Sequence, residues 1–395
     1  MGTTRDIVVL SSVRTAVGGY GGSLKSIAPC ELAATVIREA VQRAGVDPGT
    51  VGHTVLGNVI HTEARDMYVS RVASVNAGLS VDTPAFTLNR LCGSGLQAII
   101  SATQQIETGH CDIAVGGGVE CMSRAGYTST SQRWGSRMGD SAMVDMMVGA
   151  LTDPFDGVHM GITAENIAEK WGITREDQDH LAVESHQRAA AAWEEGRFKD
   201  QIVPIEIKSR KGTILFEKDE HFRADADMAG MAKLRPIFKK DGTVTAANAS
   251  GINDAASAIV LASAETAEAN GLKPMARLVG YAFAGCEPKY MGIGPVPAVR
   301  RLLEDTGMSI SDFDLFEVNE AFAAQALAVV RDLDLPMDKT NPNGSGISLG
   351  HPIGATGSIV TTKAIHELQR TGGRFALVTM CIGGGQGIAA AFERM

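Results

Sequence analysis

The chain has 395 residues, 44% hydrophobic and 21% charged, so it is long enough for two or three domains with substantial cores. Its formal net charge is −9 and it has no block of five basic residues, which argues against electrostatic attachment to nucleic acid or an anionic membrane. No apolar run approaches the ~18–20 residues of a membrane-spanning helix. Six scattered cysteines form no Cys-x-x-Cys pair. We therefore expect a cytoplasmic protein with reduced thiols and neither disulfides nor a metal site.

The sequence contains an internal repeat. Residues 38–59 read as a helix end, a turn and a strand, and residues 301–319 repeat that order. A helix, a strand and three glycines at 95–118 recur at 357–385. Both pairs are offset by about 262 residues, which indicates a duplicated unit. Short β runs alternate with amphipathic helices, so we predict an α/β fold with helices layered on mostly parallel strands.

Residues 122–250 have no counterpart in the repeat. A methionine-rich stretch at 138–147 is followed by a helical section around 162–196 and then by a charged section. Residues 199–240 carry ten Lys or Arg against seven Asp or Glu, a balance that fits a solvated surface and an anion-binding site equally well. We predict three parts: an N-terminal half (1–121 with 251–271), an inserted loop domain (122–250) and a C-terminal half (272–395).

Cys92 is a candidate nucleophile. It lies between a predicted strand at 84–90 and a helix whose apolar residues recur on one face. The helix N-terminus directs backbone N–H groups at this position, which predicts a lowered thiol pKa. Gly93 and Gly95 leave room for a substrate to approach the backbone. A packed, inert thiol is the common alternative for a cysteine in such a turn.

Three further motifs that could carry chemistry lie in the second half. Asn319 stands where a strand gives way to a helix, so it either caps that helix or orients a reactive group. His351 lies among glycines at a helix start, which suits proton transfer or oxyanion donation. Cys381 ends a strand and precedes three glycines. We predict that these residues and Cys92 each lie at the C-terminal end of a strand and meet between the halves.

Four motifs in this order resemble those of the thiolase family: NRLCGSG at 89–95, NEAF at 319–322, GHPIGATG at 350–357 and CIGGGQG at 381–387. The resemblance extends over nearly the whole chain. Within the family it is strongest to bacterial β-ketothiolases (acetyl-CoA acetyltransferases), including the broad-specificity enzymes of polyhydroxyalkanoate synthesis. It implies the thiolase fold, in which two α/β/α/β/α layered halves with mixed, mostly parallel sheets carry an inserted loop domain.

The resemblance also implies catalytic roles. Cys92 becomes S-acetylated after His351 takes its proton, and Cys381 is the second acid/base, acting on the methyl group of the incoming acetyl-CoA. Asn319 holds a water that stabilises the enolate oxygen together with His351, and the N–H groups of Cys92 and Gly383 form the oxyanion hole. The implied reaction is a reversible, ping-pong Claisen condensation of acetyl-CoA with acetyl-CoA or another short acyl-CoA. Its products are acetoacetyl-CoA or another 3-ketoacyl-CoA and free CoA, and no cofactor is needed beyond these thioester substrates.

The family binds CoA largely through the inserted segment. The matching positions are Leu151, His159, Met160, Arg223, Phe238, Ala249, Ser250, Ala321 and Phe322. Arg223 offers charge to the nucleotide end, although most of these residues could equally be ordinary core or turn residues. Met291 matches a position near the acyl pocket, where it admits or limits chain length. The methionine-rich stretch resembles the family's tetramerisation loop, which implies a homotetramer (a dimer of dimers); a packed loop is the alternative.

Other interpretations conflict with particular motifs. A decarboxylating ketoacyl synthase would use two histidines in place of Cys381 with His351. A Rossmann oxidoreductase needs Gly-x-Gly-x-x-Gly after the first strand, and the glycines at 18–22 have the wrong spacing. A non-catalytic CoA- or lipid-binding protein would keep the insert and lose the thiols. A degradative 3-ketoacyl-CoA thiolase of fatty-acid β-oxidation is the main alternative, because the sequence fixes neither chain-length preference nor direction.

Overall fold

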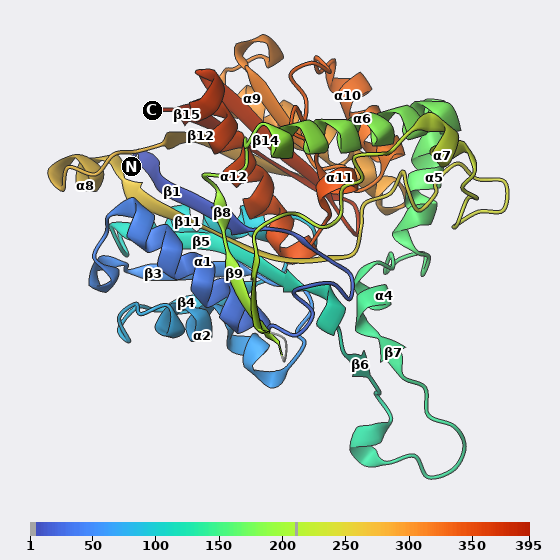
Figure 1. Cartoon of the computed structure of the whole chain (residues 1–395), viewed down its shortest axis with the longest axis horizontal. Coiled ribbons are helices and arrows are strands. Elements are labelled where there is room, and N and C mark those ends of the chain that lie inside the picture. The colour runs from blue at the N-terminus through green and yellow to red at the C-terminus, as the bar shows by residue number, and fades with distance from the viewer. Residues whose placement is uncertain (1–4, 210–211) are drawn as a thin grey trace.

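One continuous sheet joins the two halves of the chain in the computed structural model, which describes residues 5–209 and 212–395. Its main strands follow the order β13-β14-β15-β12-β1-β11-β5-β3-β4 (Figure 1). The halves meet where Val8 and Val9 of β1 pair with β12. The strand bounds are β1 (Ile7–Thr15), β3 (His53–Gly57), β4 (Ala85–Leu88), β5 (Ile113–Cys121), β11 (Asn253–Ser263), β12 (Ala276–Gly285), β13 (Leu315–Val318), β14 (Phe375–Ile382) and β15 (Gln386–Arg394).

The prediction of mostly parallel strands is wrong. In the described part of the sheet, β3 runs parallel to β4 and β5, and β13 runs parallel to β14. The other five pairings along the path are antiparallel. In the C-terminal half the reason is the connection, because only residues 383–385 separate β14 from β15 and so short a link permits a hairpin alone.

The strand positions follow the internal repeat. β3 and β13 begin at His53 and Leu315, which are 262 residues apart. β5 and β14 begin at Ile113 and Phe375, which are separated by the same number. The offset read from the sequence therefore corresponds to equivalent strands in the two halves.

Two central helices, α3 (Ser94–Glu107) and α12 (Ile353–Thr371), cross at a pair of glycines. A Cβ atom on Gly95 would lie 2.6 Å from the backbone nitrogen of Ser358, and one on Gly357 would lie 2.2 Å from that of Leu96. Real side chains do not tolerate such contacts, so both glycines are needed for this close approach. These two glycines are also 262 residues apart.

The helices and the two groups of strands form five layers, and three large apolar clusters fill the spaces between these layers. Helices α1 (Pro29–Ala44) and α2 (Val69–Asn76) cover the outer face of the N-terminal strands. Helices α3 and α12 fill the space between the two groups of strands. Helices α9 (Pro295–Thr306) and α10 (Ala323–Leu333) cover the outer face of the C-terminal strands. The predicted α/β/α/β/α layering is confirmed.

Residues 122–250 lie mostly outside these layers. The predicted helical section is confirmed as α5 and α6, and the loop between β6 and β7 projects from the body (Figure 1). None of the helices in the described ranges combines the length and the apolar composition needed to cross a bilayer. The remaining elements are β2 (Gly18–Gly19), β6 (Tyr127–Thr128), β7 (Val144–Asp145), α4 (Met146–Ala150), α5 (Met160–Trp171), α6 (Arg175–Glu194), β8 (Ile202–Val203), β9 (Ile205–Ser209), β10 (Gly212–Phe216), α7 (Met228–Ala232), α8 (Ala264–Ala269) and α11 (Gly346–Leu349).

Candidate active site

The four predicted catalytic side chains are all buried. Cys92 lies in the turn between β4 and α3, and Asn319 directly follows β13. Cys381 is the next-to-last residue of β14. His351 differs, because it follows the short helix α11 and precedes α12. The prediction that all four stand at strand ends is therefore right for three residues and wrong for His351.

Both ring nitrogens of His351 have a polar side chain within contact distance. Its Nε2 lies 3.5 Å from Nδ2 of Asn319, and its Nδ1 lies 2.6 Å from the hydroxyl oxygen of Thr356. That hydroxyl donates its one proton to the carbonyl of Pro352 at 2.9 Å, so it accepts from Nδ1. The Nε2 atom is then unprotonated, faces the Asn319 NH2 group at 3.5 Å and can take a proton. Burial lowers the pKa of His351 to about 4, which keeps the resting ring neutral.

Asn319 does not cap a helix. The next helix, α10, begins at Ala323 and is preceded by Phe322 in extended conformation. The Asn319 amide instead lies against the His351 ring, and its Oδ1 has no hydrogen-bond partner among the described residues. The second interpretation from the sequence, orientation of a reactive group, is the one that this contact favours.

The Cys92 thiol has a raised pKa, contrary to the prediction. The pKa is about 11, mainly because of burial, with a smaller upward contribution from the Glu120 carboxylate. Backbone N–H groups of Gly383 and of Cys92 itself lower it, as a helix N-terminus should, but desolvation outweighs them. The resting pair of Cys92 and His351 is therefore a neutral thiol and a neutral imidazole.

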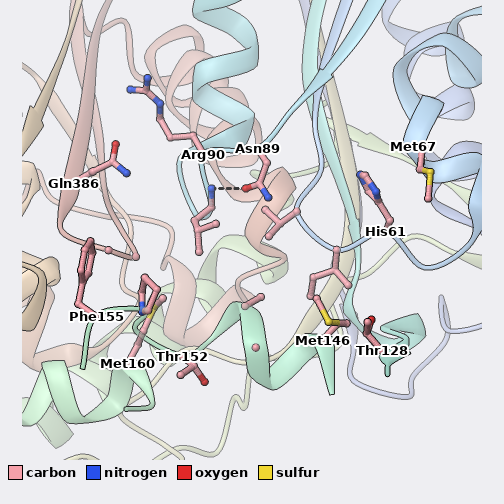
Figure 2. A pocket seen from close by; sticks show the side chains of 18 residues that line it. His61, Met67, Asn89, Arg90, Thr128, Met146, Thr152, Phe155, Met160 and Gln386 are labelled. Carbon is pink, nitrogen blue, oxygen red and sulfur yellow. Dashed lines mark hydrogen bonds between the residues drawn. The ribbon is translucent and has the colours of Figure 1, made fainter. Parts of the chain in front are cut away.

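The backbone before the thiol is strained. Leu91 has φ +45°, in the left-handed region that leucine rarely occupies. The Asn89 side chain stabilises this turn by accepting from the Leu91 N–H at 2.8 Å, the dashed line in Figure 2. The glycines beyond the thiol serve packing and not substrate approach, since a Cβ on Gly93 would lie 2.6 Å from Cδ1 of Ile382. Gly95 faces α12, as described above.

The second thiol lies close to the first. Burial raises the pKa of Cys381 well above its ordinary value, and the neighbouring Cys92 and Cys286 thiols raise it further. Cys92 packs with Ile353, two residues beyond His351. Together with the Asn319–His351 contact, these neighbours place the four predicted residues in one buried site between the halves.

Most residues predicted to bind CoA gather around Cys381. Phe238 packs against the cluster, stacking on His159 at 4.5 Å between ring centroids and meeting Phe322 edge-on at 6.3 Å. Ser250 donates its backbone N–H to the Ala321 carbonyl at 2.9 Å, which ties the insert to the C-terminal half. Leu151 packs in the Cys92 cluster instead. The buried members of the Cys381 cluster include Met160, Ala249, Met291, Ala321 and Phe322.

Arg223 stands apart from these residues. It lines a second cavity of about 450 Å³, together with His186 and His221. Its backbone N–H donates to Nδ1 of His186 at 3.2 Å. Ala249 belongs both to this cavity and to the Cys381 cluster, so the cavity lies next to the buried site.

A larger cavity of about 860 Å³ is lined by residues next to the two thiols in the chain, Leu91 before Cys92 and Gly383 after Cys381. Figure 2 shows His61 and Met67 on one flank and Phe155 and Met160 on the opposite flank. Only Met160 and Gly383 of the predicted site residues line it. Five others lie within the motifs at 89–95 and 381–387 but were assigned no role there: Asn89, Arg90, Leu91, Gly384 and Gln386. The rest come from segments without a motif: Val59, Ile60, His61, Met67, Thr128, Met146, Gly149, Ala150, Thr152, Pro154 and Phe155.

Comparison with known proteins agrees with this geometry. The thiolase N-terminal domain matches residues 7–265, and the thiolase C-terminal domain matches residues 272–394. The chain belongs to the thiolase family. It is thus an acyltransferase, and the ketoacyl synthase and oxidoreductase alternatives are excluded.

This thiolase is similar to proteins of bacteria and animals along its full length. Beta-ketothiolase BktB of Cupriavidus necator is 62% identical over 99% of this chain and 100% of that protein. The crystal structure of the Bacillus anthracis acetyl-CoA acetyltransferase superposes with a TM-score of 0.98 at 46% identity, covering 100% of both chains. Human mitochondrial 3-ketoacyl-CoA thiolase in complex with CoA superposes with a TM-score of 0.96 at 43% identity, covering 99% of this chain and 98% of that one.

Proposed function

We propose that this thiolase catalyses the reversible condensation of acetyl-CoA with acetyl-CoA or another short acyl-CoA, giving a 3-ketoacyl-CoA and free CoA. The observation that carries the proposal is the pair of buried thiols beside a neutral imidazole whose Nε2 is free to accept a proton. The names of the relatives, a β-ketothiolase and acetyl-CoA acetyltransferases, support the same substrates.

The first half-reaction forms an acyl-enzyme. The Cys92 sulfur attacks the thioester carbonyl while Nε2 of His351 takes the thiol proton and passes it to the departing CoA sulfur. General-base assistance is needed, because a thiol with a pKa of about 11 is scarcely ionised at neutral pH. The N–H groups of Cys92 and Gly383 stabilise the oxyanion, where losing one donor costs about 10²-fold or more.

The second half-reaction makes the carbon–carbon bond. Nε2 of His351 first takes the proton of the Cys381 thiol, and the Cys381 sulfur then removes a methyl proton from the second acetyl-CoA. The enolate oxygen is stabilised by the protonated His351 ring and a water held by Asn319. The carbanion attacks the Cys92 thioester, the carbon–sulfur bond breaks, and Cys92 regains a proton. The methyl proton restores the Cys381 thiol, and the proton that Cys381 had given to His351 passes to Cys92, so the enzyme returns to its starting state of two thiols and a neutral ring.

CoA binding by the inserted segment is part of the proposal. The pantetheine arm would run past Met160, Phe238 and Phe322 towards Cys381, with Arg223 in the second cavity at the nucleotide end. The match to a thiolase solved with CoA supports this arrangement. We further propose that the chain divides into the three parts predicted above, with the same bounds. We also propose that the enzyme supplies 3-ketoacyl-CoA for polyhydroxyalkanoate synthesis.

The projecting loop between β6 and β7 supports a homotetramer. Trp134 and Met138 at its tip are 90% and 94% exposed, and apolar side chains this exposed are unusual unless a partner covers them. Light scattering coupled to size exclusion should give the mass of four 41.5-kDa chains. A monomer or dimer at micromolar concentration would contradict the tetramer and leave the reaction untouched.

A degradative role in thiolysis of longer 3-ketoacyl-CoA is the second candidate. It is favoured by the 860 Å³ cavity lined by Leu91 and Gly383, which neighbour the thiols in the chain, and by 44% identity to human mitochondrial 3-ketoacyl-CoA thiolase. Acetyl adducts on Cys92 after mixing with acetyl-CoA, detected by peptide mass spectrometry, test both candidates. Thiolysis rates on acetoacetyl-CoA, a five-carbon and a longer 3-ketoacyl-CoA then decide between them, because the degradative role requires the longest substrate to be fastest.

A further inference from the structure

A buried carboxylate with no role in the steps above lies close to Cys92. Glu120, next to last in β5, has no exposed surface. Its Oε2 accepts from the backbone N–H groups of Val59 at 3.0 Å and Gly354 at 2.9 Å. Its Oε1 accepts from the backbone N–H of Ile60 and the side-chain amide of Asn58, both at 3.1 Å. One side chain therefore gathers four N–H donors.

These contacts favour the ionised carboxylate. Every neighbour donates, so a proton on either oxygen would point at an N–H group and break a hydrogen bond. Burial, with a smaller contribution from the nearby Asp254, raises the pKa of Glu120 to about 8 although the three backbone N–H groups lower it, so the ionised form that these contacts favour prevails above that pH. The four N–H groups thus resemble an anion-binding site that is filled by the protein's own Glu120 side chain.

The four donors belong to two segments from opposite halves of the chain: the loop after β3 and the first turn of α12. Val59 and Ile60 form part of the wall of the 860 Å³ cavity, and Ile60 packs against Cys92. Gly354 is in the first turn of α12, three residues after His351. The carboxylate therefore connects the segment behind the nucleophile to the segment that carries the imidazole.

Gly354 is shaped for this contact. A Cβ atom at this position would lie 2.6 Å from Oε2 of Glu120, so another residue would push the carboxylate away from the helix. The contact also satisfies one of the N–H groups that a helix leaves unpaired at its N-terminus, and it places negative charge at the positive end of a 19-residue helix.

We propose that Glu120 is a positioning residue that holds the Cys92 and His351 segments at their working distance across the two halves. This inference rests on the proposed roles of Cys92 and His351. Its charge has a second effect, since it raises the pKa of the Cys92 thiol and so opposes ionisation before His351 acts.

The test uses two substitutions of Glu120. Glu120→Gln keeps the shape, removes the charge and turns an NH2 group towards two N–H donors. We expect kcat for thiolysis of acetoacetyl-CoA to fall about 10- to 100-fold, because small misplacements of reacting groups cost this much. KM for CoA should change less than about threefold. The midpoint of the pH profile for Cys92 alkylation by iodoacetamide should move to lower pH.

Glu120→Asp separates position from charge. It retains the carboxylate but withdraws it by one methylene, so kcat should fall while the alkylation midpoint stays within about 0.3 of the wild-type value. A purely structural defect would not lower the midpoint in one variant and leave it unchanged in the other. Glu367→Gln is the matched control, because this buried carboxylate on helix α12 accepts from Nδ2 of Asn343 at 2.9 Å and from Arg370 and touches neither segment. It should leave both kcat and the midpoint near wild type.

Each outcome of these experiments either supports or overturns the positioning role. Wild-type kcat and midpoint in Glu120→Gln, or an equal loss in Glu367→Gln, overturns the positioning role. If Glu120→Gln fails to fold, Gly354→Ala attacks the same contact from the helix side, and unchanged kcat in that variant also overturns it. Peptide mass spectrometry of the wild type is done first. No acetyl adduct on Cys92 would contradict the proposed function, whereas an adduct with an unaffected Glu120→Gln variant contradicts only this inference.

Discussion

Nδ1 of His351 lies 2.6 Å from the hydroxyl oxygen of Thr356, and that hydroxyl in turn donates to the carbonyl of Pro352. The two bonds fix the ring tautomer, because the hydroxyl has only one proton to give. The neutral ring therefore presents an unprotonated Nε2 towards Asn319. Thr356 lies within the glycine-rich motif of His351, where the sequence alone gives it no distinct role.

Replacing Thr356 tests this relationship. In Thr356→Val the Nδ1–H loses its acceptor inside the protein, so the ring can adopt the other tautomer or turn away from the thiol. We expect kcat for thiolysis to fall about tenfold, equivalent to about 1.4 kcal/mol of lost positioning. Thr361→Val is the control, since this buried hydroxyl on the same helix bonds only the Gly357 carbonyl. Equal losses in both variants would contradict the tautomer argument.

The lowered pKa of His351 predicts how stability depends on pH. The unfolded ring titrates near 6.5 and the folded ring near 4, so between these values the unfolded state binds a proton that the folded state does not. The contribution is fully present above pH 6.5 and is lost as the pH falls towards 4. It amounts to about 3 kcal/mol.

Urea unfolding at pH 7.5 and pH 4.5 measures this contribution. The difference in the free energy of unfolding between the two pH values should shrink by up to about 3 kcal/mol in His351→Gln. It should not vanish, because burial also lowers the pKa of His186 to about 4. His180→Gln, at a side chain that is 63% exposed, should leave the difference unchanged. An undiminished difference in His351→Gln would refute the lowered pKa.

The sequence predicted the layers and the site because these features have local signatures. The repeat at 262 residues located equivalent strands, and Cys92, Asn319, His351 and Cys381 stand in motifs long enough to be specific. Strand direction was missed because a three-residue hairpin and a helix crossover look alike in alternating β runs. The charge state of Cys92 was missed for another reason. A helix N-terminus is visible in the sequence, whereas the burial that outweighs it depends on residues distant in the chain, such as Ile60, Met122 and Ile353 of the same apolar cluster.

The two cysteines should have separable roles. Cys92→Ala should abolish both condensation and thiolysis, because it removes the atom that carries the acyl group. Cys381→Ala should still acquire an acetyl group on Cys92 from acetyl-CoA, yet form no acetoacetyl-CoA. Cys111→Ser, at a half-buried thiol on the rim of a different cavity, should behave like wild type. Equal loss of acetylation in the Cys92 and Cys381 variants would count against this division.

The buried ion pair of Lys363 and Glu317 should dominate the stability of the C-terminal half of the site. Nζ of Lys363, on the helix that follows His351, donates to Oε2 of Glu317 at 2.7 Å and to the Gly344 carbonyl. Both side chains are almost wholly buried, and Glu317 lies two residues before Asn319. Lys363→Met leaves the carboxylate without its partner in a dry environment, so the free energy of unfolding should fall by about 3–5 kcal/mol.

The double variant Lys363→Met/Glu317→Gln separates charge from packing. With both charges gone the desolvation penalty disappears, so urea unfolding should recover part of the stability lost in Lys363→Met. Arg301→Met is the control, because its pair with Asp305 is exposed and the free energy of unfolding should stay near the wild-type value. If the double variant is no more stable than Lys363→Met alone, the loss comes from packing around the lysine stem and not from a stranded charge.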